Sequence, residues 1–392
     1  MKCNKKGVIS LALKKARAVF AGGGTRVIAL IGAFERVLEE KIFEFEAFAG
    51  VSAGSLVAFL ASVGRSPKDM LAYVTKKNLM DLVDLYGFPE GMLFRIYHHL
   101  KRLSKQGQVS PQLLIRPIVK RMVGKLIERR IKKSNHLLRG KALQEWVESI
   151  VRGQRVKYFR DLKKELIIVA FDLVTGEEFI FSRRTTPDAE IAFAITASMS
   201  AWPLFPIKEY YNQDCKQIMR LADGGLWEKF PFNIFDRFFN DDVPTVGFRL
   251  TSSETTRRDR LDIKLSGTPL SELSPRLQDI LTLVDRILSQ DKLHLSEHEM
   301  FWTASVDTQR FATLVFETDA GDIQDLLPRG RKGAEKFLTR IRNEKPPRKG
   351  VNEEMRAREI NMRQGKTRPF IHQGNIFRKI FRTIKNMFGR KV

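Results

Sequence analysis

Cysteine is nearly absent from this sequence, with two residues among 392. Two thiols exclude a disulfide framework and a cysteine-rich zinc site, because either needs more cysteines than the chain has. Cys3 lies beside lysines, but we expect a free thiol there rather than a lipid attachment site.

Long apolar runs are also missing, although 43% of the residues are hydrophobic. A spanning helix needs about 18 consecutive apolar residues, and the longest candidates here are interrupted by Lys, Arg or Glu. The N-terminal run "GVISLAL" is short for the core of a signal peptide and is stopped by Lys14 and Lys15. The sequence therefore predicts a globular, cytoplasmic protein without a membrane span.

Acidic residues are outnumbered by basic ones, 45 against 69, and the net charge of +24 is unevenly placed. Residues 91–160 carry 18 Lys/Arg against 3 Asp/Glu, and residues 329–392 carry 20 against 5. The rest of the chain carries 31 against 37, so two basic segments accompany a mildly acidic body. This pattern predicts an anionic partner, either a membrane surface or a nucleic acid.

Two strand-turn-helix units open the chain. The first joins the apolar run at residues 17–21 through "GGG" to a helical pattern at 25–41, and the second joins 43–50 through "VSAG" to 55–64. Such units predict a parallel sheet with crossover helices. Further strands are expected at "ELIIVAFDL", "EEFIFS", "TVGFRL" and "ATLVFE".

Composition divides the rest of the chain. We expect one large domain over residues 1–345, with its core at about 16–345 and a basic helical insertion at about 88–135. Residues 346–374 are polar and low in aliphatics, which is typical of a flexible linker. Residues 375–392 are expected to form a basic amphipathic helix.

Ser52 lies between two glycines in "GVSAG", where a predicted strand ends and an apolar helix begins. A serine on so tight a turn needs small neighbours, because side chains would obstruct the strained backbone, and Gly50 and Gly54 meet that need. The following helix would direct free N–H groups toward an oxyanion. Ser52 is therefore a candidate nucleophile, and the alternative is a plain small-residue turn.

Three consecutive glycines, Gly22, Gly23 and Gly24, end the first predicted strand just ahead of a helix. Their N–H groups can turn toward one point and form an oxyanion hole, and the alternative is a flexible turn. Val27 stands where a dinucleotide fingerprint needs its last glycine, and the segment lacks the G-K-[ST] of a P-loop. Arg26 is a candidate for orienting this loop or meeting a phosphate.

A base for Ser52 is hard to find among the six histidines, since none follows a turn that would present it over the sheet. His294 and His298 have the spacing of metal ligands on one helix face. However, "HLSEH" has no glutamate in its second position and no third ligand is evident, so we expect no metal.

A carboxylate is the alternative base. Asp223 ends a short apolar run and is followed by Gly224 and Gly225. An aspartate there can accept the serine proton directly if its surroundings keep it ionised and close. Taken alone, Asp-Gly-Gly favours a tight turn over a catalytic base.

Taken in order, "GGGTR", "GVSAG" and "DGG" resemble the motifs of the patatin-like phospholipases. "AFDLVTGEEFIFS" is similar to the central hairpin of that family, and "ITASMSAWPLFP" to its segment before the catalytic aspartate. The resemblance covers residues 17–250, with a weaker match over 312–341. It implies an α/β fold, a patatin-like three-layer sandwich with a mainly parallel central sheet, to which this chain adds the basic helical insertion and the basic C-terminal tail.

The resemblance also implies a mechanism. Ser52 would be the nucleophile and Asp223 its base, without a histidine, a cofactor or a metal. Gly22–Gly24 would form the oxyanion hole with Arg26 nearby. Val27 departs from the family's pattern, which usually has a glycine after the arginine, but the three preceding glycines are intact. The implied activity is hydrolysis of fatty-acyl esters of phospholipids.

The C-terminal segment "NIFRKIFRTIKNMFGRKV" decides between the two anionic partners. Its apolar residues recur on one helix face and its basic residues on the other, which is typical of a helix lying in an anionic bilayer interface. A helix docked on the body is the alternative. We expect peripheral membrane association through this tail and the insertion, and no nucleic-acid binding. The predicted membrane-binding residues are Phe377, Arg378, Lys379, Phe381, Arg382, Lys385 and Phe388.

Two other functions stay open at this level. One is a membrane-binding scaffold that keeps the fold with little catalysis. The other is a carboxylesterase with a Ser-His-Asp triad. The intact serine, aspartate and glycines favour the lipid hydrolase over the scaffold.

Overall fold

The computed structural model describes residues 13–77, 79–82, 84, 136, 138–213, 215–251, 295–308, 311 and 320–349. The predicted insertion at 88–135, the predicted strand at 312–317 and the predicted helix at 375–392 lie outside these residues, as does most of the predicted linker. The division of the chain at these segments therefore stays a prediction.

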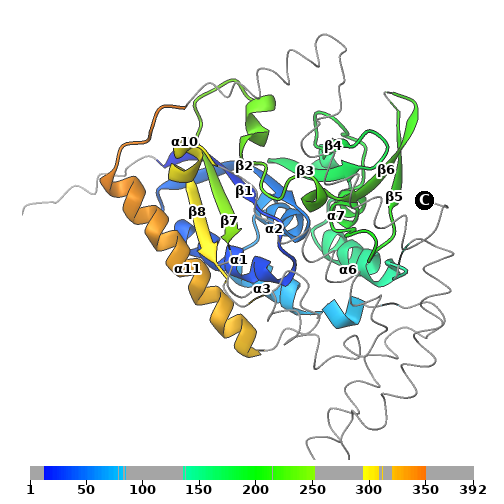
Figure 1. Cartoon of the computed structure of the whole chain (residues 1–392), viewed down its shortest axis with the longest axis horizontal. Helices are drawn as coiled ribbons and strands as arrows, with labels where there is room; N and C mark the ends of the chain where they lie inside the picture. Colours follow the sequence, from blue (N-terminus) through cyan, green and yellow to red (C-terminus); the bar gives the residue numbers. More distant parts are fainter. Residues whose placement is uncertain are drawn as a thin grey trace, which may run out of the picture.

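The described residues contain one mixed sheet of eight strands (Figure 1). The strands run in the order β5-β6-β3-β2-β1-β7-β8, and β4 pairs with β3. The strands β3, β2, β1, β7 and β8 are parallel, whereas β4, β5 and β6 form antiparallel pairs. Their bounds are β1 (Lys14–Phe20), β2 (Phe43–Val51), β3 (Glu165–Asp172), β4 (Glu177–Phe181), β5 (Lys208–Asn212), β6 (Gln217–Asp223), β7 (Thr245–Thr251) and β8 (Thr303–Asp307).

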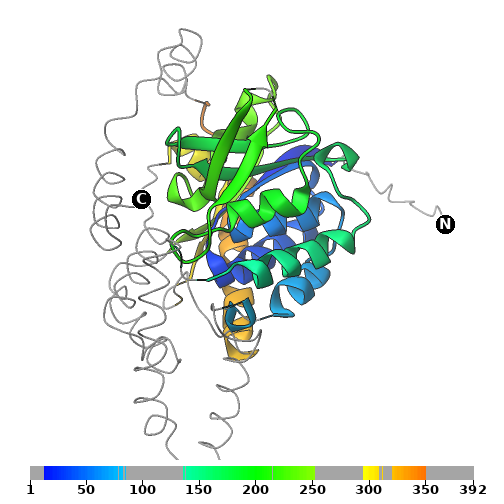
Figure 2. The ribbon, with the colours of Figure 1, turned by 90° about the vertical axis from the view of Figure 1, so that its right-hand side faces the viewer.

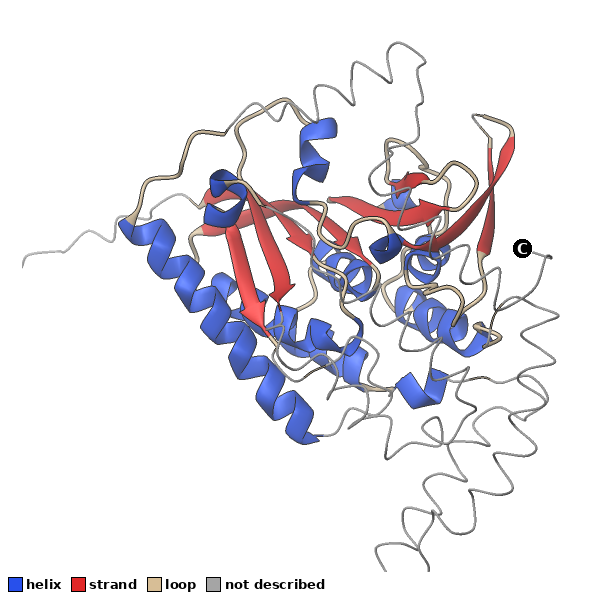
Figure 3. Ribbon diagram, viewed as in Figure 1, coloured by secondary structure: helices blue, strands red, loops and turns tan. Residues whose placement is uncertain are grey.

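Helices connect and flank these strands (Figure 3). The α-helices are α1 (Val27–Glu39), α2 (Ala53–Ser62), α3 (Pro67–Thr75), α6 (Lys141–Arg152), α7 (Ile191–Ser198), α10 (Glu297–Phe301) and α11 (Ala320–Asn343). Short 3-10 turns are η1 (Gly24–Arg26), η2 (Leu79–Leu82), η3 (Phe159–Asp161), η4 (Gly224–Leu226) and η5 (Phe232–Arg237). The predicted α/β class with a mainly parallel centre is confirmed.

The central strands form because their residues are apolar on both faces. Every residue of β3 is buried, as expected for a strand covered on two sides. The strands β5, β6 and β8 were not predicted. β5, "KEYYN", lies at the edge of the sheet and is only partly buried, so its sequence lacks a continuous apolar run.

A cluster of phenylalanines joins α1 to the sheet. Phe34 of α1 contacts Phe20, Phe48 and Phe248 on three neighbouring strands, with ring centroids 5.3 to 6.4 Å apart. Helices α2 and α7 continue this layer over β2, β3 and β6, and α6 packs against α7 (Figure 2). The glycine turn before α1 and the elbow before α2 are therefore both fixed to the sheet.

The other face of β1 carries a buried arginine. Because neighbouring residues of a strand point to opposite faces, Arg17 lies away from α1. Its guanidinium pairs with Asp241 at 2.6 Å and Glu46 at 3.0 Å, and it lies over the Phe239 ring at 3.8 Å. The segment after η5 is thereby held across this face.

Close helix packing fixes α1 from outside. An added Cβ at Gly32 would lie 2.5 Å from the Leu327 carbonyl oxygen, and one at Gly330 would overlap the Ala29 carbonyl. The backbones of α1 and α11 can approach this closely only because glycine has no side chain.

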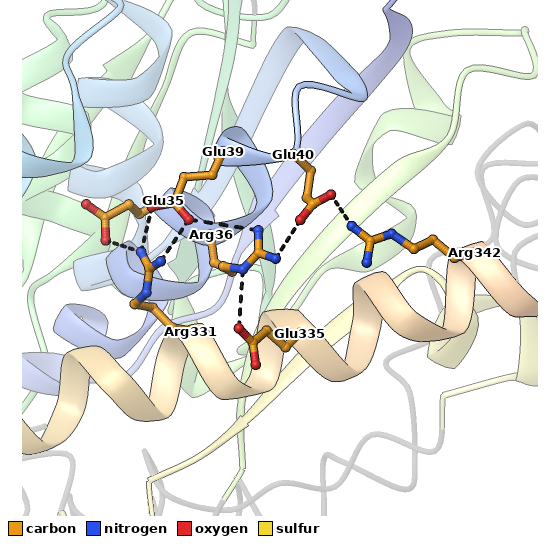
Figure 4. A network of polar contacts seen from close by, with 7 residues as sticks. All are labelled: Glu35, Arg36, Glu39, Glu40, Arg331, Glu335 and Arg342. Carbon is orange, nitrogen blue, oxygen red and sulfur yellow. Dashed lines mark hydrogen bonds and ion pairs between the residues drawn. The ribbon is translucent and has the colours of Figure 1, made fainter.

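A network of ion pairs accompanies that contact on the exposed side (Figure 4). Arg331 of α11 reaches Glu35 at 2.8 Å and Glu39 at 2.7 Å on α1. Such exposed pairs each contribute up to about 1 kcal/mol, so they fix the register of the helices more than the stability of the fold. The network also contains Arg36, Glu40, Glu335 and Arg342.

Asp84 is buried and lies at the base of the predicted insertion. Its carboxylate accepts the N–H groups of Gly140, Lys141 and Ala142 at 3.0, 2.7 and 2.9 Å, and its carbonyl accepts that of Arg139 at 3.0 Å. The carboxylate thus caps the first turn of α6. Residues on either side of the predicted insertion, 84 and 139–142, are therefore in direct contact.

Candidate active site

Two strands meet end to end beside β3, and the predicted site lies where they meet. β2 pairs with β3 as far as Val51, opposite Val169. On the same edge of β3, β6 pairs antiparallel with the next residues and ends at Asp223, opposite Ala170. The opposite edge of β3 is occupied by β4. The carboxyl ends of β2 and β6 therefore converge. This convergence brings Asp223 to Ser52, 171 positions away in the chain.

Ser52 lies in a strained turn between β2 and α2. Its backbone has φ 52° and ψ −133°, a conformation that disfavours any residue with a Cβ by about 1–3 kcal/mol. An added Cβ at Gly50 would overlap the Gly54 carbonyl, and one at Gly54 would overlap the Ala21 carbonyl. Both glycines are needed because backbone segments touch there, as the sequence predicted.

The Ser52 hydroxyl donates to the Asp223 carboxylate, with Oγ and Oδ2 2.7 Å apart. The other carboxylate oxygen, Oδ1, accepts the Gly225 N–H at 2.7 Å. Asp223 is only 1% exposed, and it is the acceptor of this hydroxyl in place of a histidine. The predicted nucleophile and the predicted base are thus in direct contact.

Burial raises the pKa of Asp223 from 3.8 to about 6. The hydrogen bonds from Ser52 and Gly225 and the positive charge of Lys229 stabilise the carboxylate and limit this rise. The carboxylate is therefore mostly ionised at pH 7, yet more basic than an exposed aspartate. A pKa in this range suits a general base.

The two glycines after Asp223 have different roles. An added Cβ at Gly224 would overlap the Val169 carbonyl, so this position needs glycine for space. Gly225 supplies the N–H that holds the carboxylate, which caps the turn η4. Together they let the chain turn sharply without moving the carboxylate away from Ser52.

The glycine turn before α1 lies beside Ser52. An added Cβ at Gly22 would lie 3.2 Å from the Ser52 Cβ. The Gly22 N–H, however, donates to the Lys229 carbonyl at 2.9 Å. Among the described residues, the amides of Gly23 and Gly24 have no acceptor. The expectation of three available amides is therefore corrected to two.

Arg26 is buried behind this turn. Its Nε donates to the Gly23 carbonyl at 3.3 Å, and its Nη1 lies 3.5 Å from the Thr308 Oγ1. Arg26 thus contacts the glycine turn, and its role in orienting that turn stays a prediction. Thr308 was missed by sequence reasoning, because nothing in its neighbourhood signals a contact with residue 26.

Sequence reasoning also missed the role of two serines, Ser198 at the last position of α7 and Ser200 two residues beyond it. The Ser198 Oγ accepts the Ser52 N–H at 2.8 Å, and the Ser200 carbonyl accepts the Asp223 N–H at 2.8 Å. Both serines are buried. Both serines lie in the segment "ITASMSAWPLFP", whose resemblance to the family gives no information on these contacts.

His298 lies on α10, where its Nδ1 is 2.9 Å from the Pro347 carbonyl. Across the described ranges, no three His, Cys, Asp or Glu side chains are grouped to hold a metal ion. His294, like His98, His99 and His372, lies outside the described residues. The expectation that His294 and His298 hold no metal therefore remains untested.

The predicted membrane-binding residues, from Phe377 to Phe388, all lie outside the described residues, as does the basic insertion. Within the part of the chain that the structure describes, no helix is both long and apolar enough to cross a bilayer. Membrane association therefore stays a proposal.

The chain is similar to a known family and to individual proteins. A model of the patatin-like phospholipase family matches residues 18–236, more than half of the chain. The probable lipid hydrolase 463L of Invertebrate iridescent virus 6 is 28% identical over 232 residues, which are 57% of this chain and 63% of that protein. The uncharacterized protein YqhO of Bacillus subtilis is 26% identical over 255 residues, 61% of this chain and 72% of that protein.

Solved structures show a more distant likeness. The crystal structure of VipD from Legionella pneumophila has a TM-score of 0.48 and 16% sequence identity, and the match covers 84% of this chain and 67% of that one. The chain spans less than two thirds of the length of its viral relative. The family match, together with the converging strands and the contact between Ser52 and Asp223, leads to one conclusion: the chain belongs to the patatin-like phospholipase family.

Proposed function

We propose that this chain is a lipid acyl hydrolase of the phospholipase A type, acting on carboxylic ester bonds through a Ser52–Asp223 dyad. The observation that carries the proposal is the 2.7 Å hydrogen bond from the Ser52 hydroxyl to a buried carboxylate, beside a glycine turn with two amides available. A nucleophile, a base and oxyanion donors are the three parts that ester hydrolysis needs.

In the first half-reaction, Asp223 takes the proton of Ser52 while Oγ attacks the carbonyl carbon of the ester. The electron pair of the carbonyl moves to its oxygen, and the amides of Gly23 and Gly24 stabilise the resulting oxyanion. Collapse of this intermediate breaks the bond to the leaving alcohol. The alcohol takes the proton from Asp223, and the acyl group stays on Ser52.

In the second half-reaction, Asp223 takes a proton from water, and the hydroxide attacks the acyl carbon. The same amides hold the second oxyanion. Its collapse breaks the bond to Ser52 Oγ, which recovers the proton from Asp223, and the fatty acid leaves. No step calls for a cofactor or a metal.

The pH dependence follows from the pKa of Asp223. The base must be ionised, so the rate constant should fall as the pH falls through about 6. The rise of this pKa above 3.8 thus makes the carboxylate a better proton acceptor at neutral pH without protonating most of it.

Lipid substrates are favoured by two further observations. The viral relative is named a probable lipid hydrolase. The net charge of +24 also suits an anionic membrane surface, because each Lys or Arg near that surface contributes about 1 kcal/mol to binding. We propose that the basic insertion and the C-terminal segment hold the enzyme peripherally on that surface.

The dyad is tested with the variants Ser52→Ala and Asp223→Asn. Ser62→Ala is a matched control, because Ser62 is a buried serine of α2 whose Oγ donates only to the Phe59 carbonyl at 2.7 Å. Hydrolysis of p-nitrophenyl butyrate and labelling by a fluorophosphonate should be lost in both dyad variants and kept in the control. Mass spectrometry should place the label on Ser52. Wild-type rates in a folded dyad variant would refute the mechanism.

The same assays separate the alternatives. A protein that binds vesicles but takes no label would be a scaffold with this fold. Loss of labelling on replacement of a single histidine, with Asp223→Asn still active, would indicate a Ser-His-Asp carboxylesterase. Lipid analysis of phosphatidylcholine vesicles treated with wild type and with Ser52→Ala should show free fatty acid and lysolipid only with wild type.

The membrane role is tested by deleting residues 375–392. Binding to vesicles that contain phosphatidylserine should weaken more than hydrolysis of p-nitrophenyl butyrate. Equal losses in both assays would mean that this segment stabilises the body of the protein instead.

A further inference from the structure

Both backbone polar groups of Ser52 are held by the side chains or amides of other serines. The Ser52 N–H donates to the Ser198 Oγ at 2.8 Å. The Ser52 carbonyl accepts the Ser55 N–H at 2.9 Å and the Ser55 hydroxyl at 2.6 Å. The carbonyl therefore has two donors, whereas the N–H depends on one acceptor.

The direction of the Ser198 hydroxyl is fixed. Its O–H donates to the Val169 carbonyl at 2.6 Å. A hydroxyl has one proton to donate, so toward Ser52 it must act as an acceptor. Ser198 is fully buried, and Val169 lies opposite Val51 in the sheet. The acceptor for the Ser52 N–H is thus anchored to β3, the strand along which β2 and β6 converge.

The same stretch also holds the other member of the dyad. Two residues beyond Ser198, the Ser200 carbonyl accepts the Asp223 N–H at 2.8 Å. The end of α7 therefore contacts the backbones of both Ser52 and Asp223. The space around it is tight, because an added Cβ at Gly224 would overlap the Val169 carbonyl that orients Ser198.

We infer that Ser198 is a positioning residue for the hydrolytic reaction, and that its hydroxyl holds Ser52 in the strained turn that aims Oγ at Asp223. The inference rests on the proposed function of the dyad. Its physical basis is the positive φ of Ser52, which a residue with a Cβ leaves unless other contacts hold it.

Removal of the Ser198 hydroxyl would leave the part-buried Ser52 N–H without its acceptor. Relaxation of φ toward negative values would then relieve the backbone and swing the Cβ–Oγ bond away from Asp223. Reactions between groups that the protein holds in a fixed geometry are sensitive to such shifts, and a displacement of about 1 Å can lower a rate about a hundredfold. The loss should appear in the chemical step, because Ser198 is buried behind Ser52 and has no face toward the substrate.

The test compares Ser198→Ala with Ser62→Ala, since each removes a buried hydroxyl from the last residue of a helix, α7 or α2. In Ser198→Ala, the rate constant for fluorophosphonate labelling of Ser52 and the kcat for p-nitrophenyl butyrate should fall about tenfold to a hundredfold, with KM nearly unchanged. Rates are expressed per folded molecule, with the folded fraction measured by circular dichroism. Ser62→Ala should stay within about twofold of wild type.

Two conservative variants keep the inference testable if Ser198→Ala folds poorly. Ser198→Thr keeps the hydroxyl and should recover most of the lost rate. Ser198→Cys keeps the shape with a weaker acceptor, so its rate should fall between those of serine and alanine. The pH midpoint near 6 should stay unchanged in all of them, because the contacts of the Asp223 carboxylate are intact.

A merely structural role would give a different result. It would lower the melting temperature and the folded fraction but leave the rate per folded molecule at the wild-type value, and that outcome would overturn the inference while the proposed function stands. If wild type itself takes no label on Ser52, the proposed function fails, and this inference fails with it.

Discussion

Asp223→Asn removes one ionisable group from the interior and changes the shape of the side chain very little. The variant should be inactive, because an amide cannot take the proton of Ser52. It should also be more stable than wild type above pH 6, since the wild-type fold must keep a charge in a site that is 1% exposed. Activity and stability are thus expected to change in opposite directions.

The size of the stabilisation follows from the pKa. In the folded protein the pKa of Asp223 is raised from 3.8 to about 6. Each pKa unit corresponds to about 1.4 kcal/mol, so the ionised carboxylate destabilises the fold by about 3 kcal/mol. A raised pKa means that the folded state binds the proton more tightly. The stabilising effect of this proton is complete below pH 3.8 and is lost as the pH rises through about 6.

Urea unfolding of wild type and Asp223→Asn at pH 5 and pH 8 measures this effect. In wild type, about half of the stabilising effect of the proton is already lost at pH 5. The difference in unfolding free energy between the variant and wild type should therefore grow by about 1.5 kcal/mol from pH 5 to pH 8. All other titrating groups are shared and cancel in the comparison. A difference between the two proteins that does not change with pH would show that the pKa of Asp223 is not raised, and would refute the account of its burial.

Three further substitutions test separate parts of the structure. Gly54→Ala would drive a Cβ into the Ala21 carbonyl. We expect the free energy of unfolding in urea to fall by about 1–3 kcal/mol and Ser52 to be labelled more slowly. Wild-type values in both assays would mean that the elbow has room for a side chain. Asp84→Ala leaves three N–H groups without their acceptor and should lower the free energy of unfolding by about 1–3 kcal/mol. Ester hydrolysis by the folded fraction should be unchanged. A smaller loss of stability would indicate that water replaces the carboxylate as acceptor. Arg331→Ala should lower stability by less than about 1 kcal/mol, and a loss that persists in about 1 M NaCl would contradict an ionic origin.

The local parts of the site could be predicted from the sequence. The serine elbow needs glycine on both sides, and the glycine turn needs residues without a Cβ, so short motifs report them. The strands with continuous apolar runs were also identified, such as β3. The edge strand β5 escaped because its burial alternates and its residues are partly polar.

The electrostatics of the site could not be predicted in the same way. Asp223 was a candidate base in the sequence, but its pKa depends on complete burial, which is a property of the assembled fold. The availability of each amide in the glycine turn also depends on the assembled fold. Gly22 and Gly24 look alike in "GGG", and only the position of the Lys229 carbonyl shows that the Gly22 N–H is already paired.

By itself, the sequence determined the conformations that depend on neighbouring residues: the turn at Ser52, the helix that follows it and the turn at Asp223. Only the tertiary structure decided that these turns meet, because β2 and β6 converge on one edge of β3 from distant parts of the chain. It also decided that Ser198 faces the Ser52 N–H, since that contact joins residues 146 positions apart. The physical reason is that backbone strain is a local quantity, whereas burial and hydrogen-bond partners depend on strand pairing over the whole chain.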